Sequence, residues 1–119
     1  MNPYQEKLKK RMDEYVHCVY RVTKNFPKEE MFGSTSQLRR AGLSVILNYI
    51  EGYARRKPLV RLNFLEISFG SLQESKYLLY FSFTEKYFSK ADYDLGIGLA
   101  EEIGAMLWKE IDNLSRSNN

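Results

Sequence analysis

Two arginine pairs are the residues of this chain best suited to hold an anion. Arg39-Arg40 and Arg55-Arg56 bracket the otherwise apolar segment 41–54. Guanidinium groups bind phosphate and carboxylate through charge and paired hydrogen bonds. Because buried charges need partners, these arginines must lie on a protein rim, in an interface between subunits, or against an anion.

The charged residues divide into two sets with different expected roles. The candidates for contact with RNA or DNA are Lys7, Lys9, Lys10, Arg11, Arg55, Arg56 and Lys57. The candidates for structural or intersubunit ion pairs are Arg39, Arg40, Glu51, Glu66 and Glu74. Glu51 precedes Arg55 by four residues, which is the spacing of an ion pair on one helix. The basic cluster at residues 55–57 can also serve as favourable charge at a helix C-terminus, so both roles stay open.

Other kinds of chemistry find little support in the residue pattern. Glu14 and His17 have the Glu-x-x-His spacing of di-iron bundles, but such sites need two of these pairs and the chain has one histidine. Cys18 follows His17 directly, and adjacent helical residues point about 100° apart. No glycine-rich phosphate loop follows a strand. We therefore predict a protein that is not an enzyme, with no catalytic residues, metal site or cofactor.

The composition fits a single domain over residues 1–119 with an uneven distribution of charge. Residues 1–57 carry 12 Lys and Arg against 6 Asp and Glu, whereas residues 58–119 carry 6 against 9. The basic half can attract nucleic acid, or it can attract the acidic half within or between subunits. The single cysteine, Cys18, allows no intrachain disulfide and is expected to be buried. Without a signal-like start or a membrane-spanning run, the expected location is cytoplasmic, with no membrane partner.

Helical periodicity with three prolines as boundaries predicts an all-α fold. The expected helices cover residues 4–25, 34–56, 58–87 and 90–114. Their short connections favour an antiparallel up-down four-helix bundle. The Ser34-Thr35-Ser36 run offers N-caps for the second helix, and Ser89 offers one for the fourth.

The second and third helices are apolar on nearly all sides, which predicts a homo-oligomer. A helix without a wide polar face is covered by more than two neighbours or by another subunit. The second helix carries Ile46, Leu47 and Ile50, and the third adds phenylalanines and leucines along its length. On the fourth helix, Gly96, Ala100 and Gly104 recur every four residues, so a neighbouring helix can approach that side closely.

A set of motifs resembles a known protein family. The matching residues are Phe26-Pro27, Glu29, Gly33, Gln37-x-Arg39-Arg40-Ala41, Ser44, Asn48, Glu51-Gly52, Arg55 and Gly70-Ser71-x-x-Glu74. They resemble the four-helix-bundle proteins encoded in intervening sequences of bacterial 23S ribosomal RNA genes. The likeness covers residues 15 to 114. The family includes the accessory variability determinant of diversity-generating retroelements.

The resemblance implies a ring-like homo-oligomer, most simply a pentamer. It also implies binding of RNA or DNA and partnership with a reverse transcriptase. The chain departs from the family pattern at Ile46, Leu47 and Ile50, where a proline and small residues are usual. The second helix is therefore expected to be straighter, with a tighter or different contact between subunits.

Two functions follow from these observations. The first is a non-catalytic, oligomeric nucleic-acid-binding accessory protein that works with the reverse transcriptase of a diversity-generating retroelement. The alternative is a self-assembling interaction module of the 23S rRNA intervening-sequence type, without a direct role on nucleic acid. In the alternative, the arginines serve in salt bridges between subunits.

Overall fold

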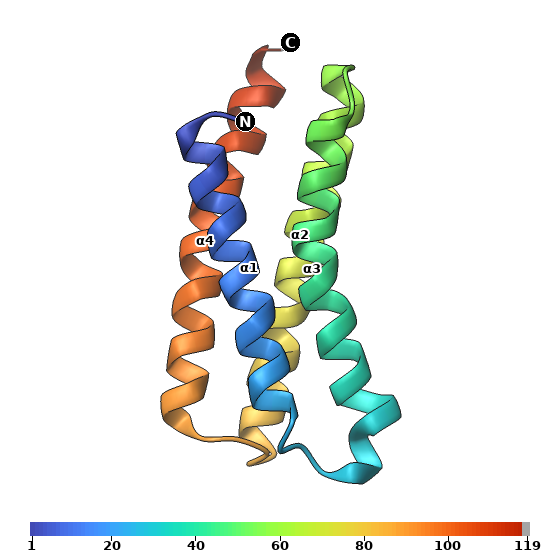
Figure 1. Cartoon of the computed structure of the whole chain (residues 1–119), viewed down its shortest axis with the longest axis vertical. Coiled ribbons are helices and arrows are strands. Elements are labelled where there is room, and N and C mark those ends of the chain that lie inside the picture. The colour runs from blue at the N-terminus through green and yellow to red at the C-terminus, as the bar shows by residue number, and fades with distance from the viewer. Residues whose placement is uncertain (118–119) are drawn as a thin grey trace.

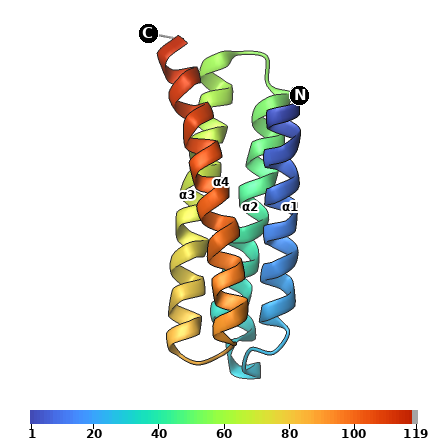
Figure 2. The ribbon, with the colours of Figure 1, turned by 90° about the vertical axis from the view of Figure 1, so that its left-hand side faces the viewer.

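The structure, a computed structural model, describes residues 1–117 and contains four long helices. These are α1 (Pro3–Thr23), α2 (Ser36–Ala54), α3 (Pro58–Thr84) and α4 (Lys90–Ser117). Figure 1 shows each helix running back along the one before it, and Figure 2 shows all four packed side by side along most of their length. The described residues form no strand. The prediction of an all-α fold with four helices is confirmed.

Helix α1 begins and ends at local signals in the sequence. The Asn2 side chain accepts a hydrogen bond from the Gln5 amide at 2.8 Å, and the Gln5 side chain accepts one from the Asn2 amide at 3.0 Å. This reciprocal pair satisfies two amides that the first helical turn leaves open, and Pro3 occupies the first turn. The helix ends at Thr23, two residues before the expected end at residue 25, because Phe26 enters a turn and packs into the core.

The connection from α1 to α2 differs from the expected capped start. A short 3-10 turn, η1 (Lys28–Glu30), leads into η2 (Met31–Thr35), in which the backbone kinks at Gly33 with a φ of −109° and a ψ of −116°, and the chain then enters α2. Thr35 has helical backbone angles and makes no side-chain cap. Glu30 acts instead, since its carboxylate accepts hydrogen bonds from the Ser34 amide at 3.4 Å and the Ser34 hydroxyl at 2.7 Å. The expected N-cap in the run 34–36 is therefore wrong.

The C-terminal ends of α2 and α3 also have identifiable causes. Helix α2 ends at Ala54, before the expected residue 56, because Arg55 is already extended ahead of Pro58. Helix α3 ends at Thr84 rather than at residue 87. There the amide of Tyr87 bonds to the Ser82 carbonyl and the amide of Lys86 to the Phe83 carbonyl, which is a Schellman motif with Lys86 at a φ of 65°.

Helix α4 starts as predicted and runs further than predicted. The hydroxyl of Ser89 accepts a hydrogen bond from the Asp92 amide at 3.2 Å, which caps the first turn. The helix continues to Ser117, three residues beyond the expected end at 114.

The core lies along the axis of the bundle and joins all four helices. Its largest fully buried side chains include Tyr15 of α1, Tyr49 of α2 and Leu72 of α3. Tyr15 makes a 2.7 Å hydrogen bond to Ser75, and Ser68 donates to the Val45 carbonyl at 2.6 Å. These bonds satisfy polar groups where helices pack closely.

Small residues let α4 approach its neighbours. A side chain added at Gly96 would meet Leu79 at 3.4 Å and the sulfur of Cys18 at 3.7 Å, and one added at Gly104 would meet Leu72 at 3.5 Å. The close approach predicted for this side of α4 is thus made against leucines of α3. Cys18 is buried, as the sequence predicts, and burial raises the pKa of its thiol.

The described residues contain neither a helix able to span a membrane nor a group of side chains placed to bind a metal ion. Over residues 1–117, none of the helices combines the length and the apolar character that crossing a bilayer requires. The same part of the chain holds no group of three or more His, Cys, Asp or Glu side chains placed to share a metal ion.

Candidate nucleic-acid interface

The two basic clusters predicted from the sequence lie toward the same end of the bundle. Figure 1 shows the start of α1, the connection from α2 to α3 and the last turns of α4 together at one end. Residues 7–11 lie in the first turns of α1, and residues 55–57 make up the connection. We call this the basic end and define it by Lys7, Lys9, Lys10, Arg55, Arg56 and Lys57.

A carboxylate from α4 holds three helices together at this end. Glu110 accepts hydrogen bonds from the hydroxyls of Tyr49 and Tyr53, both on α2, and from the Gln5 side chain of α1 at 3.2 Å. Desolvation by burial raises the pKa of both tyrosines, and the hydrogen bond and negative charge of Glu110 raise it further. Both hydroxyls therefore remain donors at neutral pH, and α1, α2 and α4 are fixed relative to one another.

The connection between α2 and α3 exposes two cations. Arg56 and Lys57 are exposed and form no ion pair within residues 1–117. Arg55 is partly used, since its guanidinium pairs with Glu51 one turn earlier and lies 5.4 Å from the centre of the Phe64 ring. Arg56 and Lys57 are consequently the cations of this connection most available to an anion.

A shallow groove between α1 and α2 carries the other cluster. Its walls include Lys7, Lys9 and Lys10, and its apolar part consists of Ile46 and Ile50. Lys9 lies 3.6 Å from the carboxylate of Glu6, whereas Lys7 and Lys10 are exposed and pair with no acid in the described chain. The groove also contains the acidic residues Glu6 and Asp13, so the unpaired Lys7 and Lys10 are its members that can attract a phosphate by charge.

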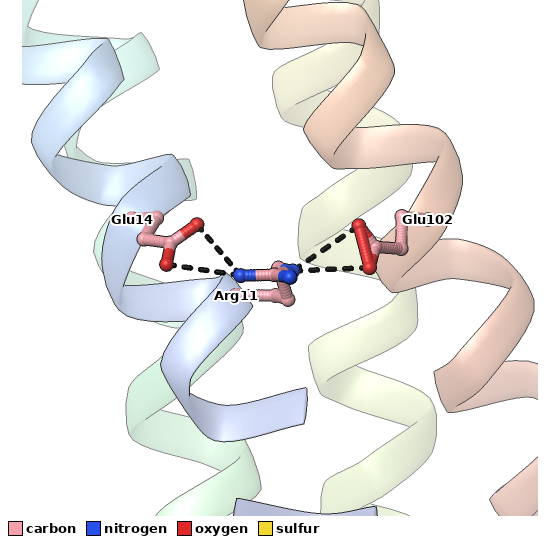
Figure 3. A network of polar contacts seen from close by, with 3 residues as sticks. All are labelled: Arg11, Glu14 and Glu102. Atoms are coloured by element: carbon pink, nitrogen blue, oxygen red, sulfur yellow. Dashed lines mark hydrogen bonds and ion pairs between the residues drawn. The ribbon is translucent and has the colours of Figure 1, made fainter. Parts of the chain in front are cut away.

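Arg11 has a different role from the lysines beside it. Figure 3 shows its guanidinium between Glu14 of α1 and Glu102 of α4. The Arg11 nitrogens lie 3.0 Å from each carboxylate. The hydrogen bond that Arg11 donates to Glu102 raises the pKa of Arg11, and the charges of both carboxylates add to the effect. Arg11 thus links α1 to α4, and because both carboxylates already neutralise its charge, it is less available to an external anion than the lysines.

The predicted ion-pair residues lie in different parts of the bundle. Arg40 of α2 contacts Glu74 of α3 at 2.6 Å, whereas Glu51 pairs with Arg55 of the basic end. Glu66 is exposed and makes no ion pair among the described residues.

Arg39 lies apart from both sets. Its guanidinium lies 4.7 Å from the centre of the Tyr20 ring, and its Nε donates to the Thr23 hydroxyl at 2.8 Å. This arginine covers the junction of α1 and α2 instead of joining a carboxylate.

Two further cations at the basic end were missed by sequence reasoning. Arg61 of α3 donates to the Arg55 carbonyl at 2.8 Å and the Gly52 carbonyl at 3.3 Å, and it lies over Tyr53. Lys109 of α4 is exposed, with its ammonium 5.9 Å from the centre of the Tyr4 ring. Both belong to the acidic half of the sequence. The expected antiparallel order of the helices could have indicated Lys109, because this order brings the end of α4 beside the start of α1.

The basic end is therefore assembled from all four helices. At this end, the exposed cations that lack a carboxylate partner among the described residues are Lys7, Lys10, Arg56, Lys57 and Lys109. Such a group can attract a phosphate backbone by charge.

Comparisons with known proteins agree on one kind of protein. The family model described as 23S rRNA-intervening sequence protein matches residues 5–109. A solved structure from Bacteroides thetaiotaomicron, described as a protein with unknown function from the S23 ribosomal protein family, superposes with a TM-score of 0.84. It is 21% identical in sequence, and the match covers 92% of this chain and 98% of the other. The comparison with curated proteins gives no match.

Proposed function

This chain belongs to the family of 23S rRNA-intervening sequence proteins, and we propose that it is a non-catalytic, oligomeric nucleic-acid-binding protein. The ligand is RNA or DNA, held through its phosphates at the basic end. The observation that carries the proposal is the group of five exposed cations at the basic end that have no carboxylate partner among the described residues, while Arg11 and Arg40 already have such partners.

Assembly is expected to raise the affinity of the basic end for nucleic acid, which is low in a single copy. The net charge of the chain is only +3, and a single basic end offers few phosphate contacts. In a ring of five copies, as the family resemblance implies, five basic ends lie around one axis. A nucleic acid that touches several of them binds more tightly through avidity. The resemblance extends the proposal to a reverse transcriptase as the protein partner. We also propose that the protein acts in the cytoplasm.

A salt titration tests the proposal most directly. We would measure binding of a labelled structured RNA at low and high salt, with the light-scattering mass of the same sample. Because bound cations release counterions from the phosphates, we expect tight binding at low salt and release at high salt. No binding at low salt by an oligomeric sample would refute the nucleic-acid role.

Paired variants at the two ends of the bundle locate the contact. Replacing Arg56 and Lys57 by Gln removes two unpaired cations, so affinity should fall and the salt dependence should weaken by about 1.5 in log–log slope. The matched control replaces Lys24 and Lys28, which are exposed near the opposite end. Equal loss in both variants would mean that total charge, and not the basic end, governs binding.

The alternative of a self-assembling module without nucleic acid has its own support. Large apolar side chains remain exposed on α2, α3 and α4 of the single chain, among them Leu47, Ile67, Tyr77 and Trp108. Contiguous exposed apolar surface marks interaction sites. An oligomer that binds neither RNA nor DNA at low salt would favour this function.

A further inference from the structure

A second pocket with positive charge lies at the end of the bundle opposite the basic end. Figure 1 shows the end of α1, the connection through η1 and η2, and the start of α2 together there. The pocket has a volume of about 350 Å³. We call it the connection pocket and define it by Lys24, Phe26, Pro27, Lys28, Met31 and Arg39. None of these residues belongs to the basic end or to the lysine groove between α1 and α2.

Arg39 is held in place at the wall of this pocket and has no acid to neutralise it. The Thr23 hydroxyl donates a hydrogen bond to the Val19 carbonyl and accepts one from Arg39 Nε, each at 2.8 Å. The guanidinium also lies 4.7 Å from the centre of the Tyr20 ring. A guanidinium carries further N–H donors on its two terminal nitrogens, and within residues 1–117 no carboxylate pairs with Arg39. Because a partly buried cation gains from a charged acceptor, Arg39 is suited to bind an external anion.

Two lysines add positive charge to the same pocket. Lys24 follows the last residue of α1 and Lys28 begins η1, and both are exposed and form no ion pair in the described part of the chain. Neither glutamate of η1 lines the pocket, and the carboxylate of Glu30 is already bonded to Ser34. Favourable charge at a helix C-terminus accounts for Lys24, but not for Lys28 or Arg39. Three cations thus line one pocket that contains no described acid.

The rest of the pocket is apolar and continues into exposed apolar side chains of η2. The Phe26 ring is buried and packs 5.3 Å from the ring centre of Tyr87 and 5.7 Å from that of Phe88, which fixes the floor of the pocket. Met31 is 56% exposed, and the next residue, Phe32, is 93% exposed. Methionine, aromatic residues and arginine are the types enriched where proteins contact other proteins.

This combination of groups favours a peptide over a nucleic acid. Nucleic acids without sequence-specific contacts are bound by a charged groove that follows the backbone and by aromatic rings that stack with bases. Here the cations line a small hollow, and the Phe26 ring is covered by its neighbours. A nucleotide has no aliphatic group to place between Pro27 and Met31. A peptide can place an apolar side chain there while an adjacent carboxylate reaches the cations.

We propose that the connection pocket binds an acidic segment of a partner protein, with an apolar side chain of that segment seated over Phe26, Pro27 and Met31. The carboxylates of the segment pair with Arg39, Lys24 and Lys28. This inference goes beyond the proposed function and does not depend on nucleic-acid binding. It gives the chain separate surfaces for protein and for nucleic acid at the two ends of the bundle.

Methionine methyl NMR spectroscopy tests the location of binding. The chain has four methionines. Met31 lines the connection pocket, Met1 precedes α1 at the basic end, and Met12 is buried in the core. The probes are a structured RNA and two synthetic peptides, one with Asp and Glu flanking Leu and Phe, the other with Lys in place of each acid. We expect the acidic peptide to shift the Met31 methyl signal and not that of Met1, and the basic peptide to shift neither.

Paired variants test the role of charge in the pocket. Lys24→Gln combined with Lys28→Gln should weaken binding of the acidic peptide about tenfold, because it removes two of the three cations. The matched control is Arg56→Gln combined with Lys57→Gln, which removes the same number of charges at the basic end. The control should keep the affinity for the peptide and lose affinity for RNA. All four side chains are exposed, so circular dichroism should show that both variants remain folded.

The outcomes separate this inference from the nucleic-acid role. If RNA does not bind but the acidic peptide shifts Met31, the pocket stands and the nucleic-acid role fails. If RNA binds and the acidic peptide leaves Met31 unchanged at every concentration measured, the pocket assignment fails alone. If RNA shifts Met31 as the acidic peptide does, or if both peptides bind equally, the pocket does not select an acidic peptide and the inference is overturned.

Discussion

At the scale of single residues, Lys86 is held in a conformation that suits glycine better. Its φ of 65° closes the Schellman motif at the end of α3. A side chain in this left-handed region is strained, whereas glycine is not. Lys86→Gly is expected to raise the free energy of unfolding by about 0.5–1 kcal/mol, measured by urea denaturation. Lys90→Gly, in the first turn of α4, should lower it, and a loss of stability in both variants would contradict the account.

The tyrosines that bond to Glu110 give stability a defined dependence on pH. Burial raises the pKa of Tyr49 and Tyr53 above their ordinary value of 10.0, so the folded protein keeps protons that the unfolded chain releases. Their contribution is present below pH 10 and is lost as the pH rises beyond it. Tyr49→Phe should flatten the alkaline fall in stability and cost about 1–3 kcal/mol at neutral pH, because it removes a hydrogen bond to a charged acceptor. An unchanged alkaline slope would argue against this role.

At the scale of helices, two glycines on α4 allow a matched test of packing. Gly96 lies against Leu79 and Cys18, whereas a side chain added at Gly98 would meet nothing within 4 Å. Gly96→Leu is expected to destabilise the protein by about 1–3 kcal/mol through overpacking. Gly98→Ala should stabilise it by up to about 1 kcal/mol through helix propensity. Thermal unfolding of the two variants measures the difference, and equal shifts would mean that the seam between α3 and α4 tolerates added volume.

The helices were predictable where one residue dominates a boundary. Pro58 and Ser89 mark the starts of α3 and α4, and both act as expected. The kinked turn before α2 was not predictable, because Glu30, which lies outside the Ser-Thr-Ser run, accepts its hydrogen bonds from Ser34. Local signals specify an end when the cap is made by an adjacent residue, and they fail when a side chain reaches across a turn.

The candidate site was predictable in its clusters and not in its extent. Residues 7–11 and 55–57 are dense enough to recognise in the sequence. Arg11 could not be separated from its lysine neighbours, because its partner Glu102 is 91 residues away. Lys109 joins the basic end only through the packing of α4 against α1. Ion pairs between residues far apart in the sequence decide which cations remain available to bind an anion. The spacing of charged residues along the chain does not show these pairs.

At the scale of the whole molecule, assembly can be tested apart from the stability of the single chain. Arg40→Ala removes a half-exposed ion pair between α2 and α3, so it should cost less than about 1 kcal/mol of stability in the single chain. In the proposed assembly it should weaken the oligomer more than it weakens the fold. Chemical denaturation and light scattering on the same variant provide the comparison. A large loss of stability in a monomeric sample would instead assign Arg40 a role in the fold of one chain.

The reactivity of the buried Cys18 thiol can be used to measure how often the helix bundle opens. The sulfur lies in the core of α1, close to Gly96 of α4, and its raised pKa keeps it protonated and unreactive. A thiol reagent can therefore modify the protein only during moments when α1 and α4 separate. The rate at which the reagent labels the native protein therefore measures the frequency of opening, and no probe has to be introduced. This rate should rise sharply in urea. A comparison of the labelling rates of dilute and concentrated samples would show whether assembly slows the opening of each subunit.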